Sequence, residues 1–372
     1  MPRKIYTKKK KIHSQIITNN WFNGSHLHKH SSIFLKDLHG YVLPHAGTKY
    51  SGNIISHTLR FKPTKKFNQV IILYLPSSNK PNVSYQKEEY YHEYFVPWRS
   101  FEHYFRHKKL TYVGINILEQ NSYPKYDNNT IYILSADFSH FLPFQKAIDL
   151  ENKAAKSMMF RDFRNTDYNQ IIDDMRTFQS FNQIIPENYF LQWVGRTRSP
   201  GLKGVGYLSF LLREQPNPHI KKPNGMFVTL YDKEMNTREC LGEWFHHNHP
   251  WSKEIENQLI QKVKLSAKKG TRFTDSDNKN IPLSNYTITY LYQKKIKKMI
   301  RGWHGIKQDA FFLPDVFLEH THTNGKWIQS GDKEWKKGTF SLSETYRKLK
   351  DKAGSLSFNP KYTLYESSVI HQ

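Results

Sequence analysis

The sequence predicts an α/β fold, with a sheet flanked by helices in the first part of the chain and an α+β unit after it. In the first part, short apolar runs end in polar loops, and later segments carry apolar residues at helical spacing. A proline-containing stretch then precedes a new strand–turn–strand pattern. We therefore expect a basic tail and histidine-containing loop (1–29), a first domain (30–215), a linker (216–224) and a second domain (225–372).

Three apolar runs in the first domain are predicted to be neighbouring strands, at residues 41–43, 69–75 and 130–134. The loops that follow them carry His45, Ser78, Asp137 and His140. Open α/β sheets bind their ligands at the carboxyl ends of the strands. If the three strands are parallel neighbours, these four side chains face one pocket.

Further elements follow from the same patterns. We expect a short helix at 53–59, a strand at 112–118 and helices at 147–160 and 168–178. The glycine-rich, basic stretch from Gly195 to Leu212 contains Arg196 and Arg198. It is predicted to be a loop that closes the pocket and ends in a helix through Leu208 and Leu212.

The chain is strongly basic, with a formal net charge of +24 over 372 residues. Such a charge favours nucleic acid, acidic membrane surfaces or acidic protein partners through long-range attraction. The alternative is compositional, because abundant Lys, Asn and Ile are typical of AT-rich genomes, including those of large DNA viruses. The length is sufficient for two domains.

The sequence predicts a soluble, intracellular protein. Cys240 is the single cysteine, so no disulfide can form within the chain. No segment approaches the roughly 20 apolar residues that a membrane span requires. The basic run at 1–11 precedes no apolar stretch, which excludes a signal peptide. We expect a cytoplasmic location, with nuclear targeting by this basic run as the alternative.

The strand ends resemble those of the Memo family. The resemblance is carried by Leu43 to Gly52 (LPHAGTKYSG) and by Ser135 to His140 (SADFSH), and it covers approximately residues 30–215. It implies the fold of class III extradiol dioxygenases, which are non-haem iron enzymes. Glu89 and Glu93 match two carboxylates of the same family pattern.

The resemblance also implies an iron or copper site that is incomplete here. The three ligand positions of the family fall on His45, Ser78 and Val194. A valine side chain has no lone pair, and a neutral serine hydroxyl is a poor replacement for imidazole. His45 with Asp137 and His140 could still form a set of two histidines and one carboxylate. We favour the interpretation that these are hydrogen-bonded pocket residues on a scaffold that has lost its metal.

The second half resembles an AMMECR-type domain. The match begins with a strand at 226–231, a polar turn and a second strand at 237–242, followed by a helix at 251–263 and a strand at 286–292. Later blocks that match are Arg272-Phe273, Trp303 to Ile306, Phe311 to Phe317 and a closing helix at 346–354. The resemblance implies an α+β fold.

The suspected site of AMMECR-type domains surrounds an Arg-Gly-Cys segment, which reads Arg238-Glu239-Cys240 here. If the family glycine allows close backbone approach or a positive φ angle, Glu239 would block it. Arg238 beside Cys240 could lower the pKa of the thiol and create a nucleophile. A buried structural cysteine is the alternative that we favour.

Three functions from different classes follow from these patterns. The favoured one is a binding or interaction protein with a degenerate metal site, whose partner is an unknown small ligand or an acidic protein. The second is an iron- or copper-dependent oxidoreductase that uses His45, Asp137 and His140, with Cys240 as a further catalytic candidate. The third is a basic nucleic-acid-binding accessory protein.

Overall fold

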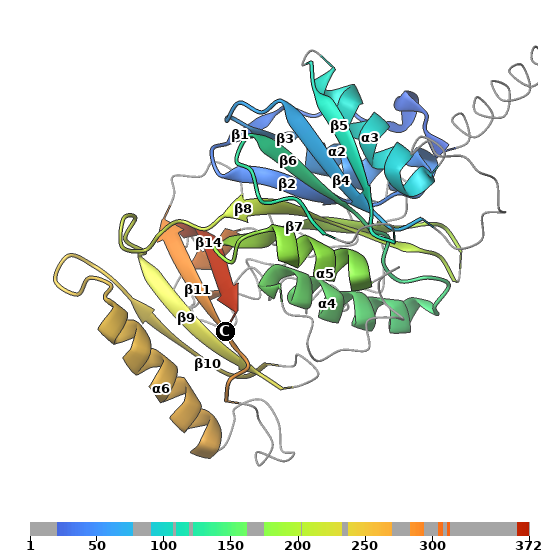
Figure 1. Cartoon of the computed structure of the whole chain (residues 1–372). Coiled ribbons are helices and arrows are strands. Elements are labelled where there is room, and N and C mark those ends of the chain that lie inside the picture. Colours follow the sequence, from blue (N-terminus) through green and yellow to red (C-terminus); the bar gives the residue numbers. More distant parts are fainter. Residues whose placement is uncertain are drawn as a thin grey trace, which may run out of the picture.

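The protein has a mixed α/β architecture built on two six-stranded sheets (Figure 1). The computed structural model describes residues 21–76, 91–106, 109–118, 122–161, 175–201, 203–232, 237–269, 283–293, 304–307, 311–312 and 363–371. Ser78, Glu89, Arg272-Phe273, the basic run at 1–11 and the expected closing helix at 346–354 lie outside these residues.

The first sheet has the strand order β5-β4-β6-β2-β8-β7. Its strands are β2 (Leu38–Leu43), β4 (Gln69–Tyr74), β5 (Thr111–Asn116), β6 (Thr130–Ser135), β7 (Tyr189–Arg198) and β8 (Gly206–Glu214). The four strands β5, β4, β6 and β2 are parallel, whereas β8 runs antiparallel to β2 and to β7. The predicted strands at 41–43, 69–75 and 130–134 are confirmed as parallel members of one sheet.

Helices cover both faces of this sheet (Figure 1). One face packs against α2 (Thr48–Leu59) and α3 (His92–Phe105), and the other against α4 (Phe144–Phe160) and α5 (Met175–Ile184). Because side chains alternate along a strand, Tyr41 and Leu43 belong to the first core and Val42 belongs to the second. A short 3-10 helix, η1 (Gly24–His26), and a two-stranded parallel sheet of β1 (Ile33–Leu35) and β3 (Phe61–Pro63) complete this unit.

Two predicted elements of the first unit need correction. The expected helix through Leu208 and Leu212 is wrong, because both residues lie in β8, which pairs with β2 and β7. Apolar residues occupy both faces of this buried strand, a pattern that does not separate a strand from a helix. The helix expected at 53–59 begins earlier, at Thr48.

The second sheet is antiparallel throughout, with the order β10-β9-β11-β14-β12-β13. Its strands are β9 (Gly225–Tyr231), β10 (Thr237–Trp244), β11 (Tyr286–Gln293), β12 (His304–Lys307), β13 (Phe311–Phe312) and β14 (Thr363–His371). The helix α6 (Lys253–Lys269) packs its Leu259 and Val263 against Met226 and Val228 of β9. The α+β expectation for this region is confirmed.

The two sheets are joined by a short connection and by direct packing. Tyr231, at the end of β9, is buried within the core that α4 and α5 share with the first sheet. The Lys156 ammonium of α4 lies 5.9 Å from the centre of the Tyr231 ring. The Tyr292 hydroxyl of β11 donates to the Pro216 carbonyl at 3.5 Å. The end of β9 therefore adds a side chain to the core between the first sheet and helices α4 and α5.

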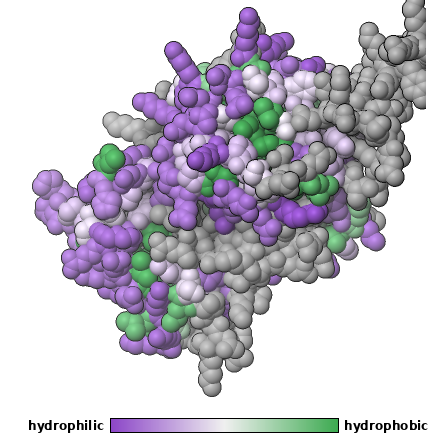
Figure 2. Space-filling model, in the orientation of Figure 1, coloured by the Kyte–Doolittle hydropathy of each residue, from purple (hydrophilic) through white to green (hydrophobic). Residues whose placement is uncertain are grey.

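The surface is dominated by hydrophilic residues, with hydrophobic ones in separate small groups on the face that Figure 2 shows. The large apolar side chains exposed among the described residues are Phe34, Tyr50, Leu118, Phe141, Ile220 and Leu265. None of the described helices has the length and apolar character needed to cross a bilayer.

Candidate functional site

The carboxyl ends of β2 and β6 bring His45 and Asp137 into contact. One carboxylate oxygen, Asp137 Oδ1, accepts hydrogen bonds from the backbone N–H groups of His45 (2.9 Å) and Ala46 (3.4 Å). The other oxygen, Oδ2, lies 3.7 Å from His45 Nε2. Both side chains are nearly buried, with 7% of His45 and 4% of Asp137 exposed. Asp137 thus connects the loops that follow two adjacent strands.

The tautomer of His45 follows from its second contact. The Ser135 hydroxyl donates its single hydrogen to the Glu93 carbonyl at 2.5 Å. Its oxygen must therefore act as the acceptor toward His45 Nδ1, which lies 3.0 Å away. The Nδ1 atom carries the hydrogen, and Nε2 is the nitrogen that faces Asp137. Protonation of Nε2 would complete an ion pair with this carboxylate.

The first turn of α3 adds His92 and Glu93 to the same place. His92 Nδ1 lies 3.3 Å from Glu93 Oε2, and the His92 ring meets the His45 ring edge-on at 5.4 Å between centroids. Trp21 stacks on the other side of His92, with centroids 4.2 Å apart. His92 and Ser135 were not among the predicted site residues, although both lie within or beside the stretches that carry the Memo resemblance.

The other predicted site residues of the first unit are placed less centrally. His140 Nδ1 contacts the Phe138 carbonyl at 2.7 Å. Val194 is half-buried on β7 and packs against the core beneath α2 and α3. Within the described part of the chain, no group of three or more His, Cys, Asp or Glu side chains is arranged to hold a metal ion.

A second polar cluster lies at the same end of the sheet, beneath α4. Arg196 and Arg198 belong to strand β7 and are buried, so the prediction of a basic loop at this point is wrong. Arg196 donates to Asn152 Oδ1 at 2.6 Å, while Arg198 Nη1 lies 3.9 Å from Glu151 Oε1. Arg198 also donates to the Leu142 carbonyl at 2.6 Å.

Glu151 of α4 is fully buried within this cluster and accepts a short hydrogen bond from the Ser139 hydroxyl. Burial raises its pKa to about 7, although the charges of Arg196 and Arg198 and the bond from Ser139 act in the opposite direction. A Cβ atom at Gly206 would lie 1.8 Å from Glu151 Oε1. Glycine at the start of β8 thus leaves room for this carboxylate in the position that it occupies.

The segment Arg238 to Cys240 lies in β10. Arg238 is ion-paired with Asp232, next to a register shift in the pairing of β10 with β9. Glu239 is 1% exposed and faces α6, where its carboxylate accepts from the Ser266 hydroxyl and the Cys240 backbone N–H, both at 2.9 Å. Cys240 is half-buried, and its sulfur accepts from the Thr229 hydroxyl at 3.2 Å.

The backbone φ angle gives no reason for a glycine at position 239. Phe141 and Arg161 are the non-glycine residues with positive φ in the described part of the chain, and Glu239 is not among them. The backbone at position 239 does not adopt the left-handed conformation that favours glycine. The glutamate is accommodated there as a buried, hydrogen-bonded side chain.

The sequence model of the AMMECR1 family matches residues 206–357. The chain therefore contains an AMMECR1 domain. The match begins at the first residue of β8, a strand that is hydrogen-bonded into the first sheet. It includes β9 to β13 of the second sheet and ends at residue 357, before β14. No curated protein matches the chain.

Proposed function

We propose that this chain is a two-domain binding or interaction protein, in which a Memo-like domain with a degenerate metal site (30–215) is joined through residues 216–224 to an AMMECR-type domain (225–372). The observation that supports it best is the environment of Asp137. Its Oδ1 accepts from the backbone of His45 and Ala46, and its Oδ2 faces His45 Nε2. The Asp137 carboxylate stabilises the loop that follows β2 by accepting hydrogen bonds from its backbone.

The ligand inventory supports the same conclusion. An iron or copper enzyme needs about three protein ligands in fixed geometry with open positions for the substrate. Val194 supplies no donor atom, so one ligand position of the family pattern is lost. The Nδ1 contacts of His45 with Ser135 and of His140 with the Phe138 carbonyl orient the two rings and do not count against a metal, because ligating histidines commonly make such a contact with the other ring nitrogen. The remaining polar atoms suit the recognition of a small polar ligand better than redox chemistry.

The charge of the chain favours a partner of opposite sign. At a net charge of +24, an acidic small molecule or an acidic protein surface is attracted over several ångströms beyond direct contact. The AMMECR1 domain contributes to this balance through exposed lysines, of which Lys268 and Lys269 at the end of α6 are examples.

Equilibrium dialysis of the full chain without an affinity tag against Fe(II) and Cu(II) tests the proposal. Wild-type protein and the His45→Ala variant should retain the same amount of metal, since adventitious binding by the 19 histidines is almost unchanged by losing one of them. Retention of one additional equivalent by the wild-type protein, lost on His45→Ala, would support the oxidoreductase alternative instead.

A further inference from the structure

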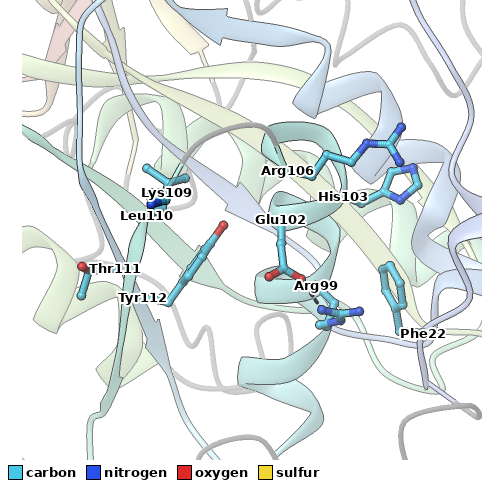
Figure 3. Close-up of a pocket in the computed structure, with 9 residues that line it drawn as sticks. All are labelled: Phe22, Arg99, Glu102, His103, Arg106, Lys109, Leu110, Thr111 and Tyr112. Atoms are coloured by element: carbon cyan, nitrogen blue, oxygen red, sulfur yellow. Dashed lines mark hydrogen bonds and ion pairs between the residues drawn. The ribbon is translucent and has the colours of Figure 1, made fainter.

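A cavity of about 600 Å³ lies beside α3 and the start of β5 (Figure 3). It is bounded by the last two turns of α3, by the segment that leads into β5 and by the chain before η1. The residues that line it are Phe22, Arg99, Glu102, His103, Arg106, Lys109, Leu110, Thr111 and Tyr112. The volume lies within the range of about 300–1,000 Å³ that is typical of small-molecule sites.

The lining carries an excess of positive charge. Arg99, Arg106 and Lys109 are cationic, and Glu102 is the one carboxylate in the lining. Glu102 is already ion-paired with Arg99. In the described part of the chain, no carboxylate forms an ion pair with Arg106 or Lys109. Residues 99, 102, 103 and 106 recur at helical spacing, so their side chains share one face of α3.

The positive charges around the cavity also affect the pKa of His103. The pKa of His103 is lowered by burial first and then by the positive charges of Arg106, Lys29 and Arg99. At neutral pH, His103 therefore adds a hydrogen-bonding imidazole to the lining and no further positive charge. An anion in the cavity would relieve the repulsion among these cations.

Aromatic rings form two of the walls. Figure 3 shows Tyr112 and Phe22 on different sides of Glu102 and Arg99, with His103 and Arg106 further along the helix. The Arg99 guanidinium lies 5.7 Å from the Phe22 ring centre and 5.5 Å from that of Trp98. Stacked arginines of this kind are held in position for a ligand at little cost in side-chain entropy.

We propose that this cavity binds a small molecule that carries a phosphate monoester on a flat aromatic group. The guanidinium group forms two parallel hydrogen bonds with phosphate oxygens, which makes arginine the preferred side chain for this recognition. Arg106 and Lys109 are the cations available for the phosphate, and Phe22 and Tyr112 provide surfaces for the aromatic group.

A role in stabilising the dipole of α3 does not account for these cations. Cations at the C-terminal end of a helix also stabilise the helix dipole, which would account for Arg106 alone. The helix dipole accounts neither for Lys109, which lies outside α3, nor for the cavity that Arg106 and Lys109 line. The part of α3 that lines the cavity begins at Arg99, roughly 10 Å along the helix from His92, so the cavity is separate from the contact between His92 and His45.

Isothermal titration calorimetry of the full chain at 0.15 M salt tests the proposal, with adenosine 5′-monophosphate, adenosine and inorganic phosphate as probes. The monophosphate should bind more tightly than either fragment. The double variant Arg106→Ala/Lys109→Ala should weaken its binding at least tenfold. Because both residues are exposed, this variant should unfold at the same temperature as the wild-type protein.

The matched control is Lys268→Ala/Lys269→Ala, which removes the same charge from the exposed end of α6. It should leave the affinity unchanged. Equal weakening by the two double variants would reveal nonspecific attraction and overturn the proposal. Absence of binding of the monophosphate would also overturn it, as would binding of a 5′-phosphorylated oligoadenylate in its place.

Discussion

The two ends of the first sheet differ in how their charged groups are satisfied. At the carboxyl ends of the parallel strands, Asp137 faces His45 and Glu151 lies among buried arginines. At the other end, Arg106 and Lys109 line a cavity and form no ion pair with a carboxylate of the described chain. The first end is closed by its own side chains, whereas the cavity beside α3 is open to an external anion.

This difference indicates which residues serve the fold and which are available for a ligand. A buried charge must be paired within the protein, since leaving it unpaired costs several kcal/mol. An exposed charge is solvated and contributes little to stability. Substitutions at the closed end should therefore change the free energy of unfolding, whereas substitutions at the open end should change ligand affinity. The following predictions test this contrast from the largest expected effect to the smallest.

Arg198→Met should produce the largest loss of stability. At pH 8 it leaves the buried Glu151 carboxylate without one of its two neighbouring arginines, which should lower the free energy of unfolding by about 3 kcal/mol. Urea unfolding followed by circular dichroism measures the change. A loss below 1 kcal/mol would show that the cluster beneath α4 does not depend on paired charge.

Glu151 should make stability depend on pH. Burial raises its pKa from 4.5 to about 7, so the folded protein holds a proton that the unfolded chain releases between these values. Its contribution is fully present below pH 4.5 and is lost as the pH rises through 7, by up to about 3 kcal/mol. Urea unfolding between pH 5 and pH 8 should show a smaller decrease in stability for Glu151→Gln than for the wild-type protein.

A second group titrates in the same range with the opposite sign. Burial, together with the nearby Lys65, lowers the pKa of His39 from 6.5 to about 4, so its contribution is lost as the pH falls. The contribution of His39 is present in the wild-type protein and in Glu151→Gln, so it cancels when the stability of one is subtracted from that of the other. Parallel pH profiles for the wild-type protein and Glu151→Gln would therefore contradict the assignment to Glu151.

Asp137→Ala should destabilise the protein by about 2 kcal/mol, because the buried backbone N–H groups of His45 and Ala46 lose their acceptor. Asp137→Asn keeps a carbonyl oxygen at the same place and should recover more than half of this loss. Thermal unfolding compares the three proteins. If alanine and asparagine were equally harmful, the ion pair with His45 would matter more than the backbone bonds.

Arg106→Met, at the open end, should change the free energy of unfolding by less than about 0.5 kcal/mol. The side chain is exposed and forms no ion pair with a described carboxylate. The same urea titration used for Arg198→Met provides the measurement. A loss comparable to that of Arg198→Met would remove the contrast between the two ends.

Much of the first sheet could be predicted from the sequence because its parallel strands are continuous apolar runs with polar loops. The three strands β2, β4 and β6 were expected from these runs, whereas their order, with β6 between β2 and β4, was not. The strand β8 was mistaken for a helix because it is buried on both faces, which removes the alternation that marks a strand.

The candidate site could be predicted only where residues follow neighbouring strand ends. His45 and Asp137 are brought together in this way. His92 required the direction of α3, and Arg196 required the pairing of β7 with β8, neither of which is encoded in local spacing. The cavity beside Arg106 depends on how α3 packs near the start of β5, and no sequence motif marks it.

The most direct test of the central claim is the metal content of the full chain, purified without an affinity tag and without added metal. Inductively coupled plasma mass spectrometry should find iron and copper far below one equivalent per chain, with the same values for wild-type protein and His45→Ala. Close to one equivalent of either metal, lost on His45→Ala, would contradict the account.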